Sequence, residues 1–172
     1  MSRVAQRVAE LLNRRRVRDV LVPGWIDRDD VPSEFRPHPL ALWLRLDLGM
    51  VRLAAEDRHD HLSARHDTVP SWSDIELLAQ AESEVVLASY GEQLFGDGRD
   101  ELACVAVRGY ETTTGKTSAL GIDFDGGHTL FLDPSWTFGI RMGSRAGEID
   151  WVEKYGRDRS PRFLRLATAR DG

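Results

Sequence analysis

The chain has 172 residues, a formal net charge of −5 and a single cysteine. This length suits one domain that buries about 70% of the surface exposed by its unfolded chain, and we expect a single domain over residues 1–172. One cysteine excludes an intramolecular disulfide. The sequence has no apolar stretch long enough to cross a bilayer, so we expect a cytoplasmic protein without membrane contact.

Charge is distributed unevenly along the chain. Residues 1–20 carry six arginines against two acidic residues, and residues 144–172 carry a net charge of +2, which leaves −11 for residues 21–143. An acidic centre disfavours nucleic acid as a ligand and suits a basic protein partner. Lys116 and Lys154 are the only lysines, and this preference for arginine is typical of GC-rich bacterial genomes.

The first predicted element is a basic amphipathic helix over residues 1–20. Its apolar residues recur at helical spacing, at Val4, Val8, Leu11 and Leu12. The segment lacks the aromatic residues that anchor helices at membranes, and an acidic region follows it. We therefore expect this helix to pack on its own domain rather than on a membrane or RNA.

The next segments predict strands and a second helix. Every second residue from Leu42 to Leu48 is leucine, which predicts a strand, and Gly49 allows a turn into another strand. Ser73 and Glu76 have the spacing of a capping box, which predicts a helix over about residues 74–82.

The strongest strand signal covers residues 101–143, which predict a β-meander. Gly126-Gly127 is typical of a hairpin turn and should pair residues 118–124 with residues 128–133. The apolar residues of the meander alternate onto one face: Leu120, Ile122, Phe124, Leu130, Leu132, Phe138, Ile140 and Met142. Together these elements predict an α+β fold, in which a twisted antiparallel sheet of about six or seven strands packs against the two helices.

The face opposite these apolar residues carries the candidate binding residues. Asp123, Asp125 and Asp133 alternate away from the apolar side chains, and Trp136 follows in a Pro-Ser-Trp turn. Carboxylates at a rim steer a charged partner, and a tryptophan anchor supplies affinity. We expect this face to meet water or a protein partner, with these four residues in contact.

Gly115-Lys116-Thr117 raises the question of a phosphate-binding loop. That loop needs four residues between its first glycine and the Gly-Lys pair, whereas five residues separate Gly109 from Gly115. A helix must also follow, and the residues after Thr117 alternate like a strand. We interpret the segment as a loop between antiparallel strands, and we expect no cofactor.

A histidine cluster is the candidate metal site. His59, His61 and His66 lie among acidic residues, and two histidines on one face of a strand can share Zn²⁺. The His-x-His spacing resembles the start of the H-x-H-x-D-H signature of metallo-β-lactamase-fold hydrolases, but the Asp-His pair of that signature is missing here. A polar loop between strands is the favoured interpretation.

No local signature indicates a catalytic nucleophile. Cys104 lies in an apolar run without a neighbouring histidine, and the sequence has no Gly-x-Ser-x-Gly motif. The leading hypothesis is a non-enzymatic protein-binding module. As a small acidic α+β protein without catalytic motifs, the chain resembles immunity proteins that neutralise bacterial toxins. The alternatives are a metal-dependent hydrolase that uses the histidines and a structural subunit of a bacterial multiprotein assembly.

Overall fold

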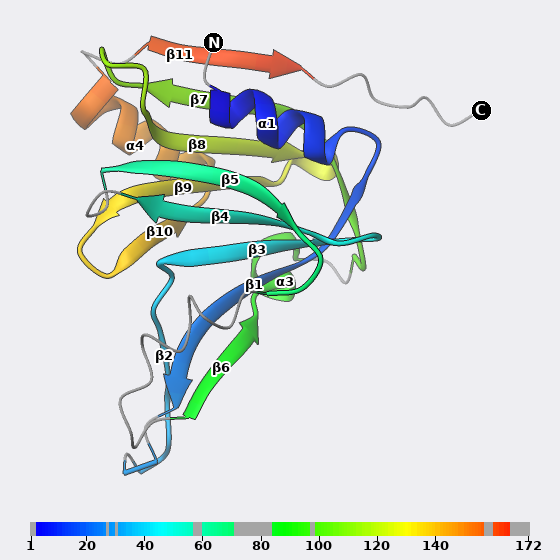
Figure 1. Ribbon diagram of the computed structural model, residues 1–172, viewed down its shortest axis with the longest axis vertical. Helices are drawn as coiled ribbons and strands as arrows, with labels where there is room; N and C mark the ends of the chain where they lie inside the picture. Colours follow the sequence, from blue (N-terminus) through cyan, green and yellow to red (C-terminus); the bar gives the residue numbers. More distant parts are fainter. Residues whose placement is uncertain are drawn as a thin grey trace.

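The computed structural model describes residues 3–26, 28–29, 31–56, 60–70, 84–96, 99–156 and 160–165 (Figure 1). These residues form an α+β fold with one large antiparallel sheet, as the sequence predicts. The described strands number eleven, more than the expected six or seven: β1 (Arg16–Ile26), β2 (Phe35–Pro37), β3 (Ala41–Leu46), β4 (Met50–Glu56), β5 (His61–Asp67), β6 (Glu84–Ser89), β7 (Leu102–Glu111), β8 (Thr117–Phe124), β9 (Thr129–Trp136), β10 (Gly139–Gly143) and β11 (Ser160–Arg165). The described helices are α1 (Arg3–Leu12), α3 (Gly91–Phe95) and α4 (Arg145–Tyr155), and a short 3-10 turn follows β8 at Asp125–Gly127.

The sheet consists of two halves with a short join between them. In one half, β7, β8, β9 and β10 pair in chain order, and β11 also pairs with β7. In the other half, β1, β3, β4 and β5 lie side by side. The halves join where Arg16 and Val17 of β1 pair with Ala103 and Leu102 of β7. Because this join is short, the two halves face each other and enclose a core.

The outer part of β1 forms an arm with β2 and β6. Residues Leu21 to Ile26 pair with β6, and Gly24 to Ile26 also pair with β2. This arm extends away from the rest of the fold at the bottom of Figure 1. Gly24 is required in the arm, because a Cβ there would collide with the backbone of Arg36 and the ring of Phe35.

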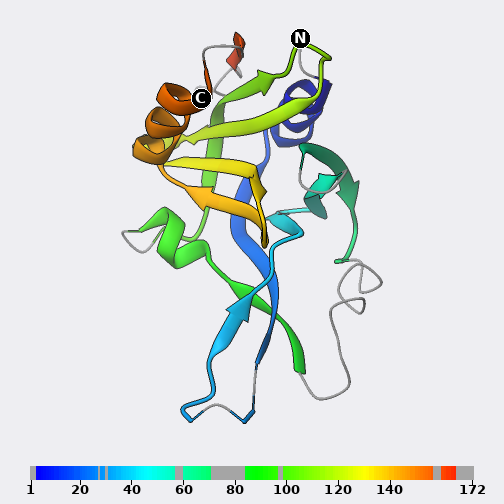
Figure 2. The same cartoon turned by 90° about the vertical axis from the view of Figure 1, so that its left-hand side faces the viewer.

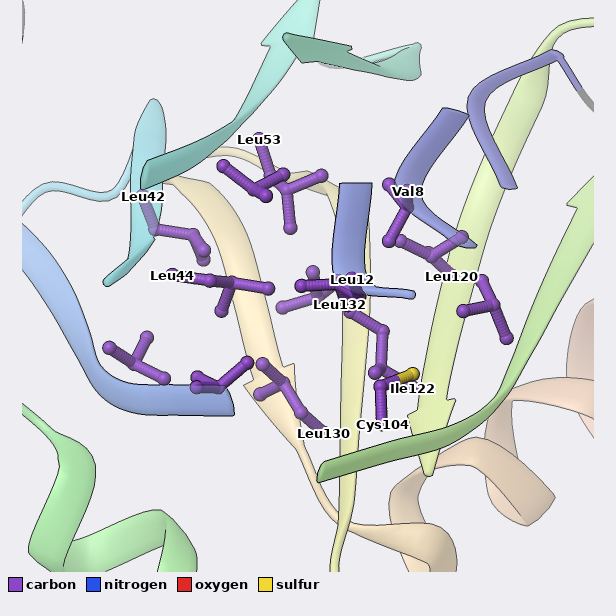
Figure 3. Packing of buried hydrophobic residues seen from close by; sticks show 14 of the residues in the cluster. Val8, Leu12, Leu42, Leu44, Leu53, Cys104, Leu120, Ile122, Leu130 and Leu132 are labelled. Carbon is purple, nitrogen blue, oxygen red and sulfur yellow. The ribbon is translucent and has the colours of Figure 1, made fainter. Parts of the chain in front are cut away.

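The main hydrophobic core fills the space between the two sheet halves. Leu42 of β3 and Leu53 of β4 belong to the same buried cluster as Leu120 of β8 and Leu130 of β9 (Figure 3). Each of these four side chains is at most 1% exposed. The alternation of the meander therefore identifies its buried face, with one exception. Phe138 is 55% exposed, because it lies in the turn between β9 and β10, where strand alternation no longer applies.

Helix α1 packs on the core of its own domain, but it is shorter than expected. Val8 and Leu12 point into the core and are fully buried (Figure 3). The prediction of a helix over residues 1–20 is wrong beyond Leu12, because Arg14 turns the chain with a φ of 60° and β1 begins at Arg16. Val17, Val20 and Val22 follow in this strand, and β-branched residues favour a strand over a helix.

The hairpin expected after β8 is present. Ile122 pairs with Leu130 across the two strands, and the connecting turn contains Gly126 and Gly127. These glycines have φ angles of 77° and 85°, which glycine adopts without the steric cost that other residues pay. The helix expected near residues 74–82 lies outside the described residues.

Helix α4 covers the outer face of the half formed by β7 to β10. Trp151 of α4 is 4% exposed and packs against Tyr110 of β7 and Phe131 of β9, with ring centroids 5.2 and 5.8 Å away. Figure 2 shows α4 and α1 on opposite sides of β7 and β8. The face expected to meet water or a partner is therefore partly covered by a helix that the sequence pattern does not predict.

A buried ion pair fixes α4 to the sheet. Glu148 of α4 is 1% exposed and accepts hydrogen bonds from Nε and Nη2 of Arg108 at 2.7 and 2.8 Å. The Tyr110 hydroxyl and Nη1 of Arg145 also donate to Glu148, each at 2.7 Å. Arg108 is itself 2% exposed and donates to both carboxylate oxygens of Asp123. The position of α4 is therefore set by a charged network rather than by an apolar stripe.

Gly121 of β8 leaves the space that this ion pair occupies. A Cβ at position 121 would lie 2.5 Å from Oε1 of Glu148 and 2.9 Å from Nη2 of Arg108. We predict that Gly121→Ala lowers the free energy of unfolding by about 1–3 kcal/mol, the usual cost of overpacking. Gly147→Ala in α4 is the matched control, because no described atom lies within 4 Å of a Cβ there and alanine favours a helix by about 0.5–1 kcal/mol. Urea unfolding measures both effects, and equal stabilities of the two variants would contradict the prediction.

Candidate functional site

Two of the four predicted partner-binding residues are engaged within the protein. Both carboxylate oxygens of Asp123 accept hydrogen bonds from Arg108. Burial acts to raise the pKa of Asp123, but the hydrogen bonds from Arg108 outweigh it and hold this pKa below its usual value. Oδ1 of Asp125 accepts the backbone N–H of Ala103 at 2.9 Å, and Oδ2 lies 3.4 Å from Nη1 of Arg16. The expected acidic face is therefore largely used for internal contacts.

The other two predicted residues, Asp133 and Trp136, line a pocket between β9, β10 and α4. The pocket has a volume of about 400 Å³. Asp133 is 6% exposed, and its Oδ1 accepts hydrogen bonds from the backbone N–H and the hydroxyl of Ser135 at 2.9 and 2.6 Å. The residue paired with Asp133 across the strands is Arg141, which also lines the pocket.

Aromatic side chains line much of this pocket. Phe131 and Trp151 are 3% and 4% exposed, whereas Tyr155 is 52% exposed, so the first two lie deeper in the fold. Trp136 is half-buried, and its ring meets the exposed ring of Phe138 edge-on, with the centroids 5.2 Å apart. The pocket therefore combines a rigid aromatic lining with an exposed aromatic turn beside it.

Three exposed charged residues of the pocket have no ion pair with any described residue. Arg141 comes from β10, and Asp150 and Lys154 come from α4. The guanidinium carbon of Arg141 lies 5.8 Å from the ring centroid of Trp136, which is the distance of a cation–π contact. These charges are available to a ligand at low cost, because binding would break no ion pair among the described residues.

The two candidate metal ligands that the structure describes, His61 and His66, do not converge. His61 and His66 both belong to β5, and their odd spacing places them on opposite faces of the strand. His66 lies near Gly49, whereas His61 pairs across the strands with Glu56. His59 lies outside the described residues. Among those that are described, no group of three or more His, Cys, Asp or Glu residues could share a metal ion.

The Gly115-Lys116-Thr117 segment is a connection between antiparallel strands, as expected. It joins β7 to β8, Gly115 has a φ of 81°, and the N–H of Thr112 donates to the carbonyl of Lys116 at 2.8 Å. A strand rather than a helix begins at Thr117. The Lys116 ammonium lies 3.3 Å from Asp60. The segment therefore lacks the loop-to-helix geometry of a phosphate site.

Cys104 is a buried thiol in β7. Its side chain is 6% exposed, and burial raises its pKa to about 12. A thiol with this pKa is protonated at neutral pH, and the thiolate is the form that acts as a nucleophile. Cys104 therefore behaves as a small core residue.

The part of the pocket that α4 forms was missed because this helix was not predicted. Trp151, Lys154 and Tyr155 all come from this helix. The buried residues of α4 are Glu148 and Trp151, so the helix has no continuous apolar stripe from which helical periodicity could be recognised. The available signal was weaker: a serine precedes the helix, and a glycine follows it.

The ion pair beneath α4 stays charged at neutral pH. Burial would raise the pKa of Glu148, but hydrogen bonds from Arg108 and Tyr110 outweigh it and hold the pKa below the ordinary value of 4.5. Burial would likewise lower the pKa of Arg108, but its hydrogen bonds to Asp123 and Glu148 raise it. The pKa of Tyr110 is raised, because burial and the Glu148 carboxylate both disfavour the phenolate. Because this ion pair holds α4 on the sheet, charged hydrogen bonds fix the side of the pocket that α4 forms.

Comparison of the chain with protein-family models, with curated proteins and with solved structures found no match. In the part of the chain that the structure describes, no helix is both long enough and apolar enough to span a membrane. The function is therefore inferred from the pocket and its surroundings.

We predict that the stability of the protein falls as the pH drops through the lowered pKa of Glu148. The unfolded chain takes up this proton near pH 4.5, and the folded protein takes it up only at a lower pH, so the contribution is complete above the ordinary pKa. Glu148→Gln should lower the free energy of unfolding by about 3–5 kcal/mol at neutral pH, since it leaves a buried charge of Arg108 less well paired. This difference from the wild type should shrink in acid, where Glu148 is protonated as well.

Urea unfolding across a pH series measures this effect. Glu153→Gln is the matched control, because Glu153 is exposed on the same helix, and this variant should follow the wild type at every pH. A difference between Glu148→Gln and the wild type that does not change with pH would contradict the assignment.

Proposed function

We propose that the protein is a non-enzymatic binding module that receives a protein partner at the pocket and at the neighbouring turn of residues 136–138. The observation that carries this proposal is the exposure of Phe138 beside Trp136. Phe138 is 55% exposed although its ring already contacts Trp136 at a centroid distance of 5.2 Å. A large aromatic side chain held at the surface by another ring is well suited to insert into a partner.

The surrounding residue types support the same role. Tryptophan, tyrosine and arginine are the residues that most often dominate binding energy in protein interfaces. Trp136, Tyr155 and Arg141 all line the pocket, and Tyr155 is 52% exposed. These three residues belong to β9, α4 and β10, which hold their backbones in place. Binding would therefore cost little entropy for ordering the chain at the site.

The overall charge suits a basic partner, as in the pairing of an immunity protein with a toxin. The net charge is −5, and an acidic protein attracts a basic one over distances of about 10 Å at moderate salt. Neither alternative function gains support from the described residues. His61 and His66 lie on opposite faces of β5. Helix α1 buries its apolar face on its own domain, so that face is not available to a neighbouring subunit.

The proposal is tested by a photo-crosslinking amino acid placed at position 138. Leu48 is the matched control position, because it is 72% exposed and lies in a different turn, between β3 and β4. A partner that binds at residues 136–138 should crosslink from position 138 and not from position 48. Mass spectrometry identifies the captured protein, which is then purified for affinity measurements.

With the purified partner, Phe138→Ala should weaken binding by about 2 kcal/mol or more, which is roughly thirtyfold in Kd. Leu48→Ala should change binding by less than about 0.5 kcal/mol. The free energy of unfolding of both variants should stay close to that of the wild type, because both side chains are exposed. Equal crosslinking from both positions, or equal affinities of the two variants, would overturn the proposal.

A further inference from the structure

Asp133 is a buried carboxylate with one oxygen left without a hydrogen bond from any described residue. The side chain is 6% exposed and lines the pocket. Its Oδ1 accepts both hydrogen bonds from Ser135, and Oδ2 accepts none from the residues that the structure describes. Oδ2 is not among the buried polar atoms that lack a partner, so it still reaches the open pocket. A donor that enters the pocket can therefore form a strong, charge-assisted bond with this oxygen.

The cationic residue that pairs with Asp133 across the strands does not form an ion pair with its carboxylate. Arg141 is directly opposite Asp133 across β9 and β10, yet the two side chains form no ion pair. The guanidinium of Arg141 instead lies over the ring of Trp136, with its carbon 5.8 Å from the centroid. This contact shows that Trp136 presents a ring surface to which a guanidinium group can bind.

The other walls of the pocket suit a flat cation as well. Phe131, Trp151 and Tyr155 contribute three further aromatic rings to its lining. A guanidinium group is planar, stacks on such rings and is more weakly hydrated than an ammonium group, so it loses less on entering an aromatic site. The volume of about 400 Å³ leaves room for one such side chain with water.

We propose that the pocket binds an arginine side chain of the protein partner. Its guanidinium group donates a hydrogen bond to Oδ2 of Asp133 and stacks against the aromatic lining, while Asp150 adds a second negative charge. This proposal rests on the proposed function, because it assigns the arginine to the partner that binds at the same site.

An anionic ligand is the competing possibility, since Arg141 and Lys154 also line the pocket. Both cations are exposed, whereas Asp133 is buried. The interaction of two charges weakens about fourfold when the effective dielectric constant rises from about 20 near the protein to about 80 in water. The buried carboxylate therefore contributes more to selectivity than the two exposed cations.

The test titrates ¹⁵N-labelled protein with blocked arginine, the N-acetyl amide of the amino acid. The readout is the indole N–H resonances of Trp136 and Trp151, assigned with the variants Trp136→Phe and Trp151→Phe. Both resonances should shift, with a dissociation constant in the millimolar range because the probe is small. The same derivatives of citrulline, which has the shape of arginine without its charge, and of glutamate should cause much smaller shifts.

Two variants are expected to change the affinity for arginine in opposite directions. Asp133→Asn keeps an oxygen that can accept the hydrogen bonds of Ser135, and it should weaken arginine binding at least about tenfold. Arg141→Ala removes a competing cation from an exposed position, and it should strengthen arginine binding about twofold. Asp150→Asn is the matched carboxylate control and should weaken binding less than Asp133→Asn, because Asp150 is exposed.

Three outcomes would overturn the inference: no shift with arginine, equal shifts with citrulline, or weaker binding by Arg141→Ala together with a response to glutamate. None of these would affect the proposed function if a partner still crosslinks from position 138. Conversely, if blocked arginine binds but no partner crosslinks from position 138, the pocket is an arginine-binding site and the proposal of a protein partner is wrong.

Discussion

The ion pair between Arg108 and Glu148 determines where α4 lies, and the pocket depends on that position. The two charged groups are 2% and 1% exposed, so each would be costly to bury without the other. Three groups donate hydrogen bonds to the Glu148 carboxylate, and Arg108 also binds Asp123. A helix held in this way cannot slide along the sheet without breaking charged hydrogen bonds, whereas an apolar contact tolerates such movement more easily.

The requirements of this pair explain several residues around it. Gly121 leaves the space for the two side chains, since even a methyl group at this position would collide with both. The rings of Tyr110, Phe131 and Trp151 cover the outer face of the sheet next to the pair. Because α4 is fixed, Trp151 also forms part of the pocket lining, so a single helix serves both stability and the candidate site.

Local alternation made the sheet predictable, and tertiary contacts made the site difficult to predict. The hairpin of β8 and β9 follows from its period-2 pattern and its two turn glycines, since both signals lie within a few residues. The end of α1 at Leu12 depends on the strand pairing of the residues that follow, with β3 and β7, which are distant in sequence. Helix α4 is held by Arg108, which is 40 residues from Glu148, so the only local signals for it were the serine before it and the glycine after it.

The difference between Asp123 and Asp133 illustrates what sequence alone could not separate. Alternation assigns both residues to the same face of one hairpin, and both were expected to contact a partner. Asp123 has a side chain 28% exposed, yet both of its oxygens accept hydrogen bonds, from Arg108 and from Thr129. Asp133 is 6% exposed, yet its Oδ2 accepts no hydrogen bond from a described residue.

Asp133 is the more deeply buried residue, yet its carboxylate accepts hydrogen bonds from Ser135 alone, whereas that of Asp123 accepts them from two described residues. Asp123 is therefore explained by the folded protein itself, through the charge that it provides to Arg108. Asp133 is explained only in part, by the two hydrogen bonds that its Oδ1 accepts from Ser135. The remaining oxygen belongs to a residue of the pocket wall, beside rings that suit a flat cation. A carboxylate oxygen that faces a pocket and accepts no hydrogen bond from a described residue is open to a donor from a ligand, and an arginine side chain supplies such a donor.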